Sequence, residues 1–278
     1  MTNAAVEVQD HGRSVTKHWV TLANGEAYHY ARAGEVGRPV LVFLHGYTDS
    51  WRSIEPVISS LAVRHLVLAL DQRGHGHTGH KFDSYRLEDF AEDAAEFIET
   101  LGVSDVTLIG HSLGSLVAQR VATERPDLVS RLVLIGSADT ASGNDVLHDL
   151  QAEVAALPDP VPVDFALAFQ ASTVFHPIGE DQLAEFARES RRVPLTVWKA
   201  IAAELAENTE VVAQAITVPT LILWGDRDGI FNLQAQQRLE RAIANARLIA
   251  YHEVGHAPHW ERPLAVAEDI AAFVAADA

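Results

Sequence analysis

Eight short runs of apolar or β-branched residues recur along the chain, separated by stretches with helical spacing. The runs lie near residues 17–22, 27–32, 40–44, 65–70, 105–109, 131–136, 219–224 and 246–251. From residue 40 onward they are continuously apolar, as expected for strands whose two faces are both covered by helices. The clearest helical patterns fall at 87–101, 112–125, 232–244 and 263–276. This alternation predicts an α/β fold with a doubly wound, mostly parallel eight-stranded sheet. The first two runs alternate in polarity and predict an antiparallel hairpin at its edge.

The alternation of strand and helix breaks once, between Gly136 and Pro219. This stretch has helical periodicity and little strand character, and prolines divide it into short segments. Its apolar faces are carried by Phe165–Phe169, Leu183–Phe186 and Val197–Ile201. We therefore expect a helical insertion within an otherwise alternating domain.

Composition narrows the classes of function. The chain has 278 residues, of which 48% are hydrophobic, and a formal net charge of −17. The negative charge argues against nucleic acid and anionic membrane surfaces as partners, because their phosphates would be repelled. The sequence has no apolar run long enough for a membrane span, no signal-peptide pattern at its start and no cysteine. We expect a globular, cytoplasmic protein that uses neither a disulfide nor a thiol nucleophile.

The strongest chemical signal is Gly110–Gly114, which reads Gly-His-Ser-Leu-Gly between an apolar strand and a helical pattern. In this context Gly-x-Ser-x-Gly predicts a nucleophile elbow, in which a strand turns sharply into a helix with a serine at the apex. Small residues let strand and helix approach closely, and the helix N-terminus offers unpaired N–H groups to a developing oxyanion. Ser112 is therefore the candidate nucleophile, and Ser115 is expected to be a packing residue.

A serine hydroxyl is a weak nucleophile unless a histidine takes its proton and a carboxylate orients that histidine. Downstream of Ser112, the run near 219–224 is followed by two aspartates, Asp226 and Asp228. Among the 14 histidines, His256 follows the last strand in a Gly-His pair, which makes it the candidate base. The chain order Ser, Asp, His is the order expected of an α/β-hydrolase.

Three further motifs complete a resemblance to that family. They are Val40–Tyr47, which ends in His-Gly-Tyr, Leu66–Gly76, which contains Asp-Gln-Arg-Gly-His-Gly, and Gly255–Pro263, which begins Gly-His-Ala-Pro. With the elbow, they make nearly the whole chain resemble an α/β-hydrolase of the esterase, lactonase and C–C hydrolase branch. The resemblance implies a hydrolase core formed by residues 1–138 and 215–278, and a helical cap over the nucleophile formed by residues 139–214.

The resemblance also implies roles for individual residues. The spacing after its strand matches Asp228 to the acid of the triad, whereas Asp226 is expected to be a surface residue or a turn cap. Asp139 stays an alternative, because some similar hydrolases take their acid from that loop. The oxyanion hole is expected from the backbone N–H groups of Tyr47 and Leu113.

Two groups of charged residues have competing interpretations. Asp71 and Arg73 look catalytic in isolation, but they are predicted to form a charge pair that holds the loop after the fourth strand. Arg188, Arg191 and Arg192 cluster in the expected cap, where the first interpretation is a solvated helix face beside acidic neighbours. The alternative is a bidentate clamp on a substrate carboxylate.

The leading hypothesis is a serine hydrolase that cleaves a small, mostly apolar carboxylic ester or lactone through an acyl-enzyme. One alternative keeps the triad but cleaves a carbon–carbon bond in a diketone-like acid, or makes peracids. Another is a hydrolase-fold ligand receptor or regulator with little turnover. A serine at the elbow argues against the epoxide hydrolase and dehalogenase branches, which use aspartate there. The sequence has no metal-ligand pattern and no dinucleotide fingerprint, so neither a metal nor a cofactor is expected.

Overall fold

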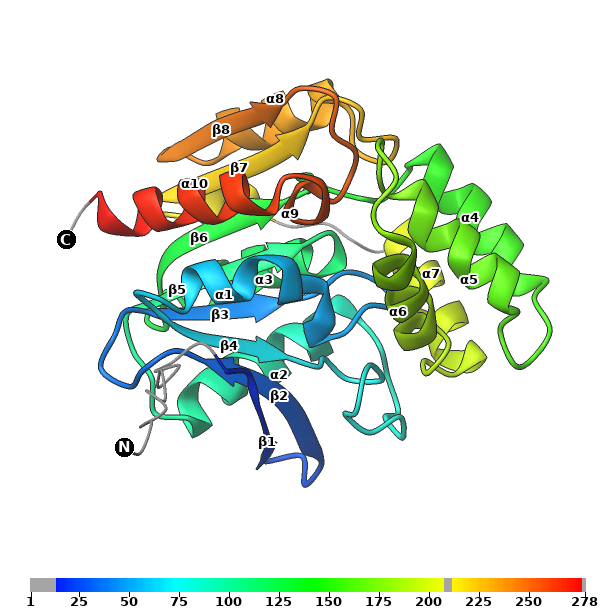
Figure 1. The fold of residues 1–278 in the computed structure, drawn as a ribbon, viewed down its shortest axis with the longest axis horizontal. Coiled ribbons are helices and arrows are strands. Elements are labelled where there is room, and N and C mark those ends of the chain that lie inside the picture. The colour runs from blue at the N-terminus through cyan, green and yellow to red at the C-terminus, as the bar shows by residue number, and fades with distance from the viewer. Residues whose placement is uncertain (1–13, 208–211, 277–278) are drawn as a thin grey trace, which may run out of the picture.

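The computed structural model describes residues 14–207 and 212–276. Eight strands form one sheet in the order β1-β2-β4-β3-β5-β6-β7-β8 (Figure 1). They span β1 (Thr16–Thr21), β2 (Ala27–Ala33), β3 (Val40–Leu44), β4 (Leu66–Leu70), β5 (Val106–His111), β6 (Val129–Ile135), β7 (Thr220–Gly225) and β8 (Ala246–Tyr251). β2 pairs antiparallel with β1 and β4, and every other neighbouring pair is parallel. The predicted sheet and its antiparallel edge hairpin are therefore confirmed.

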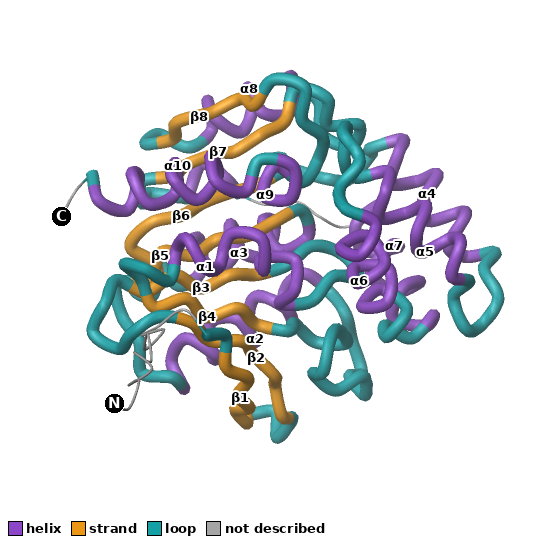
Figure 2. Tube along the Cα trace, viewed as in Figure 1, coloured by secondary structure: helices purple, strands orange, loops and turns teal. Residues whose placement is uncertain are grey.

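Helices cover both faces of this sheet, as the flanking purple segments in Figure 2 show. They are α1 (Glu55–Leu61), α2 (Leu87–Thr100), α3 (Leu113–Glu124), α8 (Leu233–Ala242), α9 (Pro258–Glu261) and α10 (Pro263–Ala275). Along β3, Leu41 and Phe43 enter the core under α1 and α10, while Val42 and Leu44 enter the core under α2 and α3. Because successive strand residues point to opposite faces, a strand buried on both faces must be apolar throughout.

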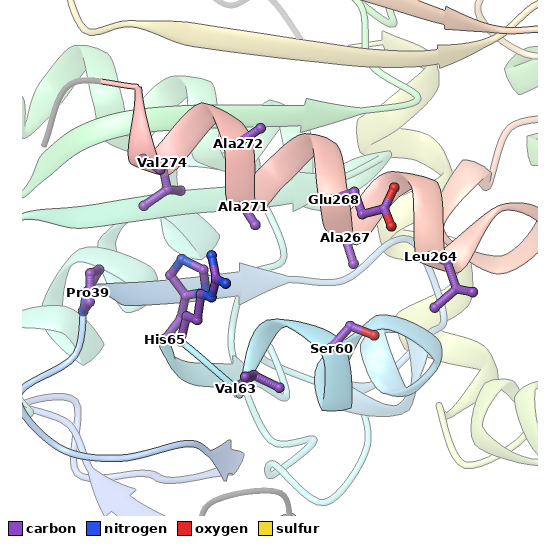
Figure 3. Close-up of a pocket in the computed structure, with 12 residues that line it drawn as sticks. Pro39, Ser60, Val63, His65, Leu264, Ala267, Glu268, Ala271, Ala272 and Val274 are labelled. Carbon is purple, nitrogen blue, oxygen red and sulfur yellow. The ribbon is translucent and has the colours of Figure 1, made fainter.

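Two short helices of the core, α1 and the four-residue α9, were not predicted. α1 follows a short 3₁₀ turn at Trp51–Ile54 and begins with a proline in its first turn. Its seven residues are too few to display the helical repeat that identifies longer segments. α1 and α10 border a surface groove of about 630 Å³, lined in part by Val63, Leu264 and Ala271 (Figure 3). None of the predicted site residues lines this groove.

Between β6 and β7 the described residues form four α-helices, which we call the cap helices, and a 3₁₀ turn at Ala213–Ala215. The cap helices are α4 (Asp145–Ala155), α5 (Val163–Ser172), α6 (Glu180–Ser190) and α7 (Leu195–Glu207). α4 packs against α7 and α5 against α6. Figure 1 shows the group beside the end of the sheet toward which the parallel strands point. The division into a core and a cap at residues 139–214 stays a prediction. Within the described residues, no helix is both long and apolar enough to cross a bilayer.

Candidate active site

Ser112 lies at the turn between β5 and α3 with φ 50° and ψ −118°. A non-glycine residue rarely adopts a positive φ, so this backbone is strained and must be held by its surroundings. A Cβ at Gly110 would lie 2.1 Å from the carbonyl oxygen of Gly114, and one at Gly114 would lie 2.2 Å from that of Leu44. Strand and helix therefore approach so closely that both glycines of the motif are sterically required.

The imidazole of His256 is held by Asp228. Its Nδ1 lies 2.9 Å from Asp228 Oδ2. The other carboxylate oxygen accepts hydrogen bonds from the N–H groups of Ile230 and Phe231, at 2.8 and 3.0 Å. The histidine side chain is 3% exposed and the aspartate side chain 0%. His256 Nε2 is buried and has no hydrogen-bond partner among the described residues. One ring nitrogen is thus fixed while the other is available to accept a proton.

The two alternative acids have other partners. Asp226 Oδ2 lies 2.7 Å from His252 Nδ1, and Asp226 Oδ1 accepts a hydrogen bond from the N–H of Glu253 at 2.7 Å. Asp226 therefore caps the turn after β8. Asp139 forms two contacts of 3.1 Å with the guanidinium of Arg238.

Ser112 and His256 line the same cavity, which lies between the cap helices and the core and has a volume of about 30 Å³. The apolar part of its wall comes mostly from cap helices and consists of Leu147, Leu150, Phe169, Leu205, Ile230 and Trp260. A cavity of this size has room for about two water molecules.

Two backbone donors are available beside Ser112. Neither the N–H of Tyr47 nor that of Leu113 donates a hydrogen bond to any group in the part of the chain that the structure describes. Leu113 is the first residue of α3, where N–H groups have no partner within the helix. Tyr47 lines the cavity from the loop after β3. These are the two positions that the sequence assigns to the oxyanion hole.

The predicted charge pair between Asp71 and Arg73 is wrong, because Asp71 has partners from other segments. It accepts hydrogen bonds from the N–H of Trp51 at 2.7 Å and the N–H of His77 at 2.9 Å, and its Oδ2 lies 2.7 Å from Nδ1 of His29. Burial opposes ionisation, but these hydrogen bonds outweigh it and lower the pKa of the Asp71 carboxyl. Asp71 therefore joins the loops after β3 and β4 to β2.

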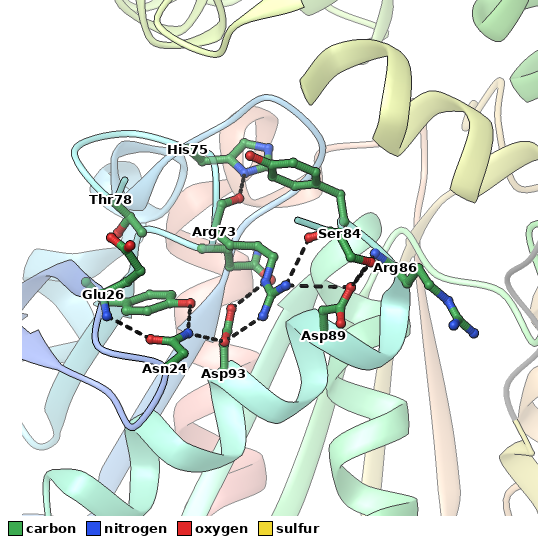
Figure 4. Close-up of polar contacts among 12 residues, drawn as sticks. Asn24, Glu26, Arg73, His75, Thr78, Ser84, Arg86, Asp89 and Asp93 are labelled. Atoms are coloured by element: carbon green, nitrogen blue, oxygen red, sulfur yellow. Dashed lines mark hydrogen bonds and ion pairs between the residues drawn. The ribbon is translucent and has the colours of Figure 1, made fainter. Parts of the chain in front are cut away.

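Arg73 pairs instead with α2. Its guanidinium donates to both carboxylate oxygens of Asp93, at 2.6 and 2.8 Å, and to the Ser84 carbonyl at 3.0 Å (Figure 4). Asn24 contacts the same carboxylate from the β1–β2 turn. Arg73 is thus a structural residue, as expected, but it holds its loop to a helix rather than to Asp71.

The three cap arginines do not line the cavity. All three are exposed. Their partners are Glu185 for Arg188, the Val161 carbonyl for Arg191, and the Gly76 carbonyl with His77 for Arg192. In this structure they lie on a solvated surface, and none is placed to bind a carboxylate beside Ser112.

Three polar residues of the cavity wall, Asp49, Gln170 and Thr173, were not singled out from the sequence. Asp49 belongs to the loop after β3 and Gln170 to α5, and their side chains meet at the cavity. Neither lies in a motif whose spacing has chemical meaning, and their contact depends on the packing of α5 over the core. Among the described residues, no group of three or more histidine, aspartate or glutamate side chains is arranged to hold a metal ion.

Comparison with known proteins identifies the family. The model of the alpha/beta hydrolase fold family matches residues 39–263, so the chain belongs to that family. It is 33% identical to epoxide hydrolase 4 of Mus musculus over 115 residues, which are 40% of this chain and 32% of that protein. The match therefore spans about a third of the length of this relative.

Other relatives match over most of their length. A bifunctional esterase/perhydrolase of Acinetobacter calcoaceticus is 26% identical over 285 residues, covering 92% of this chain and 99% of that protein. The crystal structure of the enol-lactonase of Burkholderia xenovorans has a TM-score of 0.81 at 22% identity, covering 92% of this chain and 99% of that chain. The structural similarity shows the shared fold.

Proposed function

We propose that this chain is a serine hydrolase that cleaves a small carboxylic ester or lactone. The observation that carries the proposal is the arrangement of His256: Nδ1 is held by the buried Asp228, and Nε2 is unpaired beside the cavity that Ser112 lines. A fixed imidazole with one free nitrogen beside a strained serine is what nucleophilic acyl transfer requires.

In the proposed reaction, His256 Nε2 accepts the hydroxyl proton as Ser112 Oγ attacks the carbonyl carbon. The N–H groups of Tyr47 and Leu113 bind the oxyanion of the tetrahedral intermediate. The intermediate collapses to an acyl-enzyme, and His256 returns the proton to the departing alkoxide. Water then attacks the acyl-enzyme with His256 again as base, releasing the acid and restoring Ser112. With a lactone, alcohol and acid leave as one hydroxy acid.

The cavity favours an ester or lactone over the alternative substrates. A carbon–carbon hydrolase for a diketone-like acid needs a cation for the substrate carboxylate. The three cap arginines lie elsewhere, and among the described residues no lysine or arginine lines the cavity. Matches to epoxide hydrolases cover 40% of this chain in one case and 91% in another, but Ser112 stands where that branch has aspartate. A ligand receptor would use the same pocket, so turnover separates it from an enzyme.

Replacement of the nucleophile tests the proposal. Ser112→Ala is expected to lower kcat on p-nitrophenyl butyrate or δ-valerolactone by at least about 10⁴-fold, because triad members act as a unit. A fluorophosphonate probe is expected to label wild-type protein at Ser112, as located by peptide mass spectrometry. Ser60→Ala, at an exposed serine of α1, is the matched control. Full activity of Ser112→Ala would refute the proposal, and absence of both label and turnover would favour a receptor.

A further inference from the structure

We propose that Asp49, His111 and Gln170 form a subsite beside Ser112 that binds a hydrogen-bond donor of the substrate, such as a hydroxyl or an N–H group. This inference rests on the proposed function and narrows its substrate class. The substrate would be an ester or lactone that carries such a donor and no carboxylate.

Gln170 supplies the first unpaired acceptor. Its Nε2 donates to Asp49 Oδ1 at 3.0 Å and to Ser190 Oγ at 2.6 Å. Because an ionised carboxylate can only accept hydrogen bonds, the amide nitrogen must face Asp49. The amide oxygen Oε1 is left as an acceptor, and it is buried with no partner among the described residues. Gln170 is 1% exposed, so this unpaired oxygen is not solvated from outside.

His111 supplies the second acceptor. Its Nε2 lies 3.2 Å from the carbonyl oxygen of His256, which can only accept, so Nε2 carries a proton. Burial lowers the pKa of His111, which favours the neutral ring, and Nδ1 is then an acceptor. Nδ1 is buried without a hydrogen-bond partner in the described chain and lies 3.7 Å from Asp49 Oδ2.

Asp49 is the third acceptor and carries the charge of the subsite. Gln170 Nε2 donates to its Oδ1 at 3.0 Å, whereas no donor among the described residues is hydrogen-bonded to its Oδ2. The ionised Oδ2 and the Nδ1 lone pair of His111 therefore face each other without a donor between them. The buried Nδ1 of His111 is destabilised in this arrangement until a donor binds to it.

The backbone keeps the space between these acceptors open. A Cβ at Gly46 would lie 2.8 Å from His111 Nδ1 and 3.0 Å from Asp49 Oδ2. Any side chain at this position would crowd both atoms. Glycine leaves the two acceptors accessible from the cavity that all three residues line.

The side-chain donors of the cavity wall are already engaged. The Tyr47 hydroxyl donates to the Trp198 carbonyl at 2.7 Å and the Thr173 hydroxyl to the Gln170 carbonyl at 2.8 Å. The indole N–H of Trp260 donates to the Ser53 carbonyl at 2.9 Å. Apart from the catalytic groups, the wall thus offers acceptors and apolar surface. A ligand donor complements this wall, and a ligand carboxylate is repelled by Asp49.

Near-isosteric substrate pairs test the subsite. Ethyl 3-hydroxybutyrate and ethyl 3-methylbutyrate differ by a hydroxyl in the acyl part, and 2-hydroxyethyl butyrate and propyl butyrate differ by a hydroxyl in the alcohol part. In at least one pair, wild-type protein is expected to prefer the hydroxyl compound by about tenfold or more in kcat/KM. Monoethyl succinate, which carries a carboxylate, is expected to be the poorest substrate.

Two variants show whether the subsite causes the preference. In Asp49→Asn the ratio of kcat/KM within the responding pair is expected to fall to within about threefold, since a neutral amide binds a hydroxyl less strongly than a carboxylate does. The discrimination against monoethyl succinate is expected to decrease in the same variant. Gln170→Leu provides a second test at the same subsite. Asp149→Asn makes the same charge change at an exposed position of α4 and is expected to keep the wild-type ratio.

The outcomes separate this inference from the proposed function. Equal kcat/KM within both pairs, or a ratio that neither variant changes, overturns the subsite while the serine hydrolase stands. A variant that lowers kcat/KM equally for both members also overturns it, because Asp49 and Gln170 would then merely join α5 to the core. Absence of turnover on every ester together with absence of label at Ser112 overturns both proposals.

Discussion

Two aspartate–histidine pairs lie side by side in sequence at the ends of β7 and β8. Asp228 and His256 are 2.9 Å apart, and Asp226 and His252 are 2.7 Å apart. The first pair has side chains that are 0% and 3% exposed, whereas the His252 side chain is 78% exposed. If the shorter distance alone identified the catalytic pair, the solvent-exposed pair of Asp226 and His252 would be chosen.

The difference lies in what surrounds each pair. The carboxylate of Asp228 is fixed by two further N–H groups, and its histidine, whose other ring nitrogen is buried and unpaired among the described residues, lines the same cavity as Ser112. Water competes for the polar groups of His252, so that pair stabilises a turn and little else. A buried, oriented imidazole retains one proton position, which is the property a general base needs.

Burial of an aspartate–histidine pair is not sufficient to make it a candidate for catalysis either. His29 and Asp71 form a third pair, at 2.7 Å, with side chains 3% and 0% exposed. Neither residue lines the cavity that contains Ser112. Catalytic potential therefore requires three conditions together: a short contact, burial, and a free nitrogen at the cavity. The following tests take one condition at a time.

The largest expected effect concerns Asp228. In Asp228→Asn the amide oxygen can still accept from Ile230 and Phe231, but its NH₂ group faces His256 Nδ1. That nitrogen must then become an acceptor, and the proton moves to Nε2, where it blocks removal of the Ser112 proton. We expect kcat to fall by about 10⁴-fold with folding retained, as measured by ester hydrolysis and thermal melting.

The matched variants are Asp226→Asn and Asp139→Asn, each expected to keep kcat within about threefold of wild type. If Asp226→Asn or Asp139→Asn loses most of its kcat while Asp228→Asn stays active, the acid of the triad is assigned to the wrong residue.

The sequence predicted the sheet well because its strands are buried on both faces and therefore apolar throughout. It also placed Asp228, His256 and Ser112 in the segments that meet at one end of the sheet. It failed where partners come from distant segments: Asp71 and Arg73 are near neighbours in a loop, yet they bind β2 and α2 respectively. The contact of Asp49 with Gln170 spans 121 residues and depends on the docking of α5, which no local pattern encodes.

A stability measurement tests the pair of His29 and Asp71, which is buried but does not line the cavity. Asp71→Ala leaves the N–H groups of Trp51 and His77 without an acceptor and removes the partner of His29. We expect it to lower the free energy of unfolding by about 3 kcal/mol, measured by urea titration, while kcat per folded molecule stays within about threefold. Asp83→Ala, at an exposed position of the following loop, is the control. A selective loss of kcat without a loss of stability would show that Asp71 acts in the reaction.

The smallest expected effect is the contribution of the exposed pair, Asp226 and His252, to stability. Its sign follows from its dependence on pH. The hydrogen bond from His252 lowers the pKa of Asp226 below its ordinary value of 3.8. A carboxyl whose pKa is lower in the folded state contributes stability at neutral pH, and this contribution is lost as pH falls below that value and through the folded pKa. Because the pair is exposed, we expect Asp226→Asn to lower Tm at pH 7 by no more than about 2 °C. The difference from wild type should shrink in high salt, since exposed charges are screened, and should vanish once the pH is low enough to protonate the folded carboxyl. A difference that persists at that pH would mean that Asp226 stabilises the turn without its charge, through the hydrogen bond from Glu253.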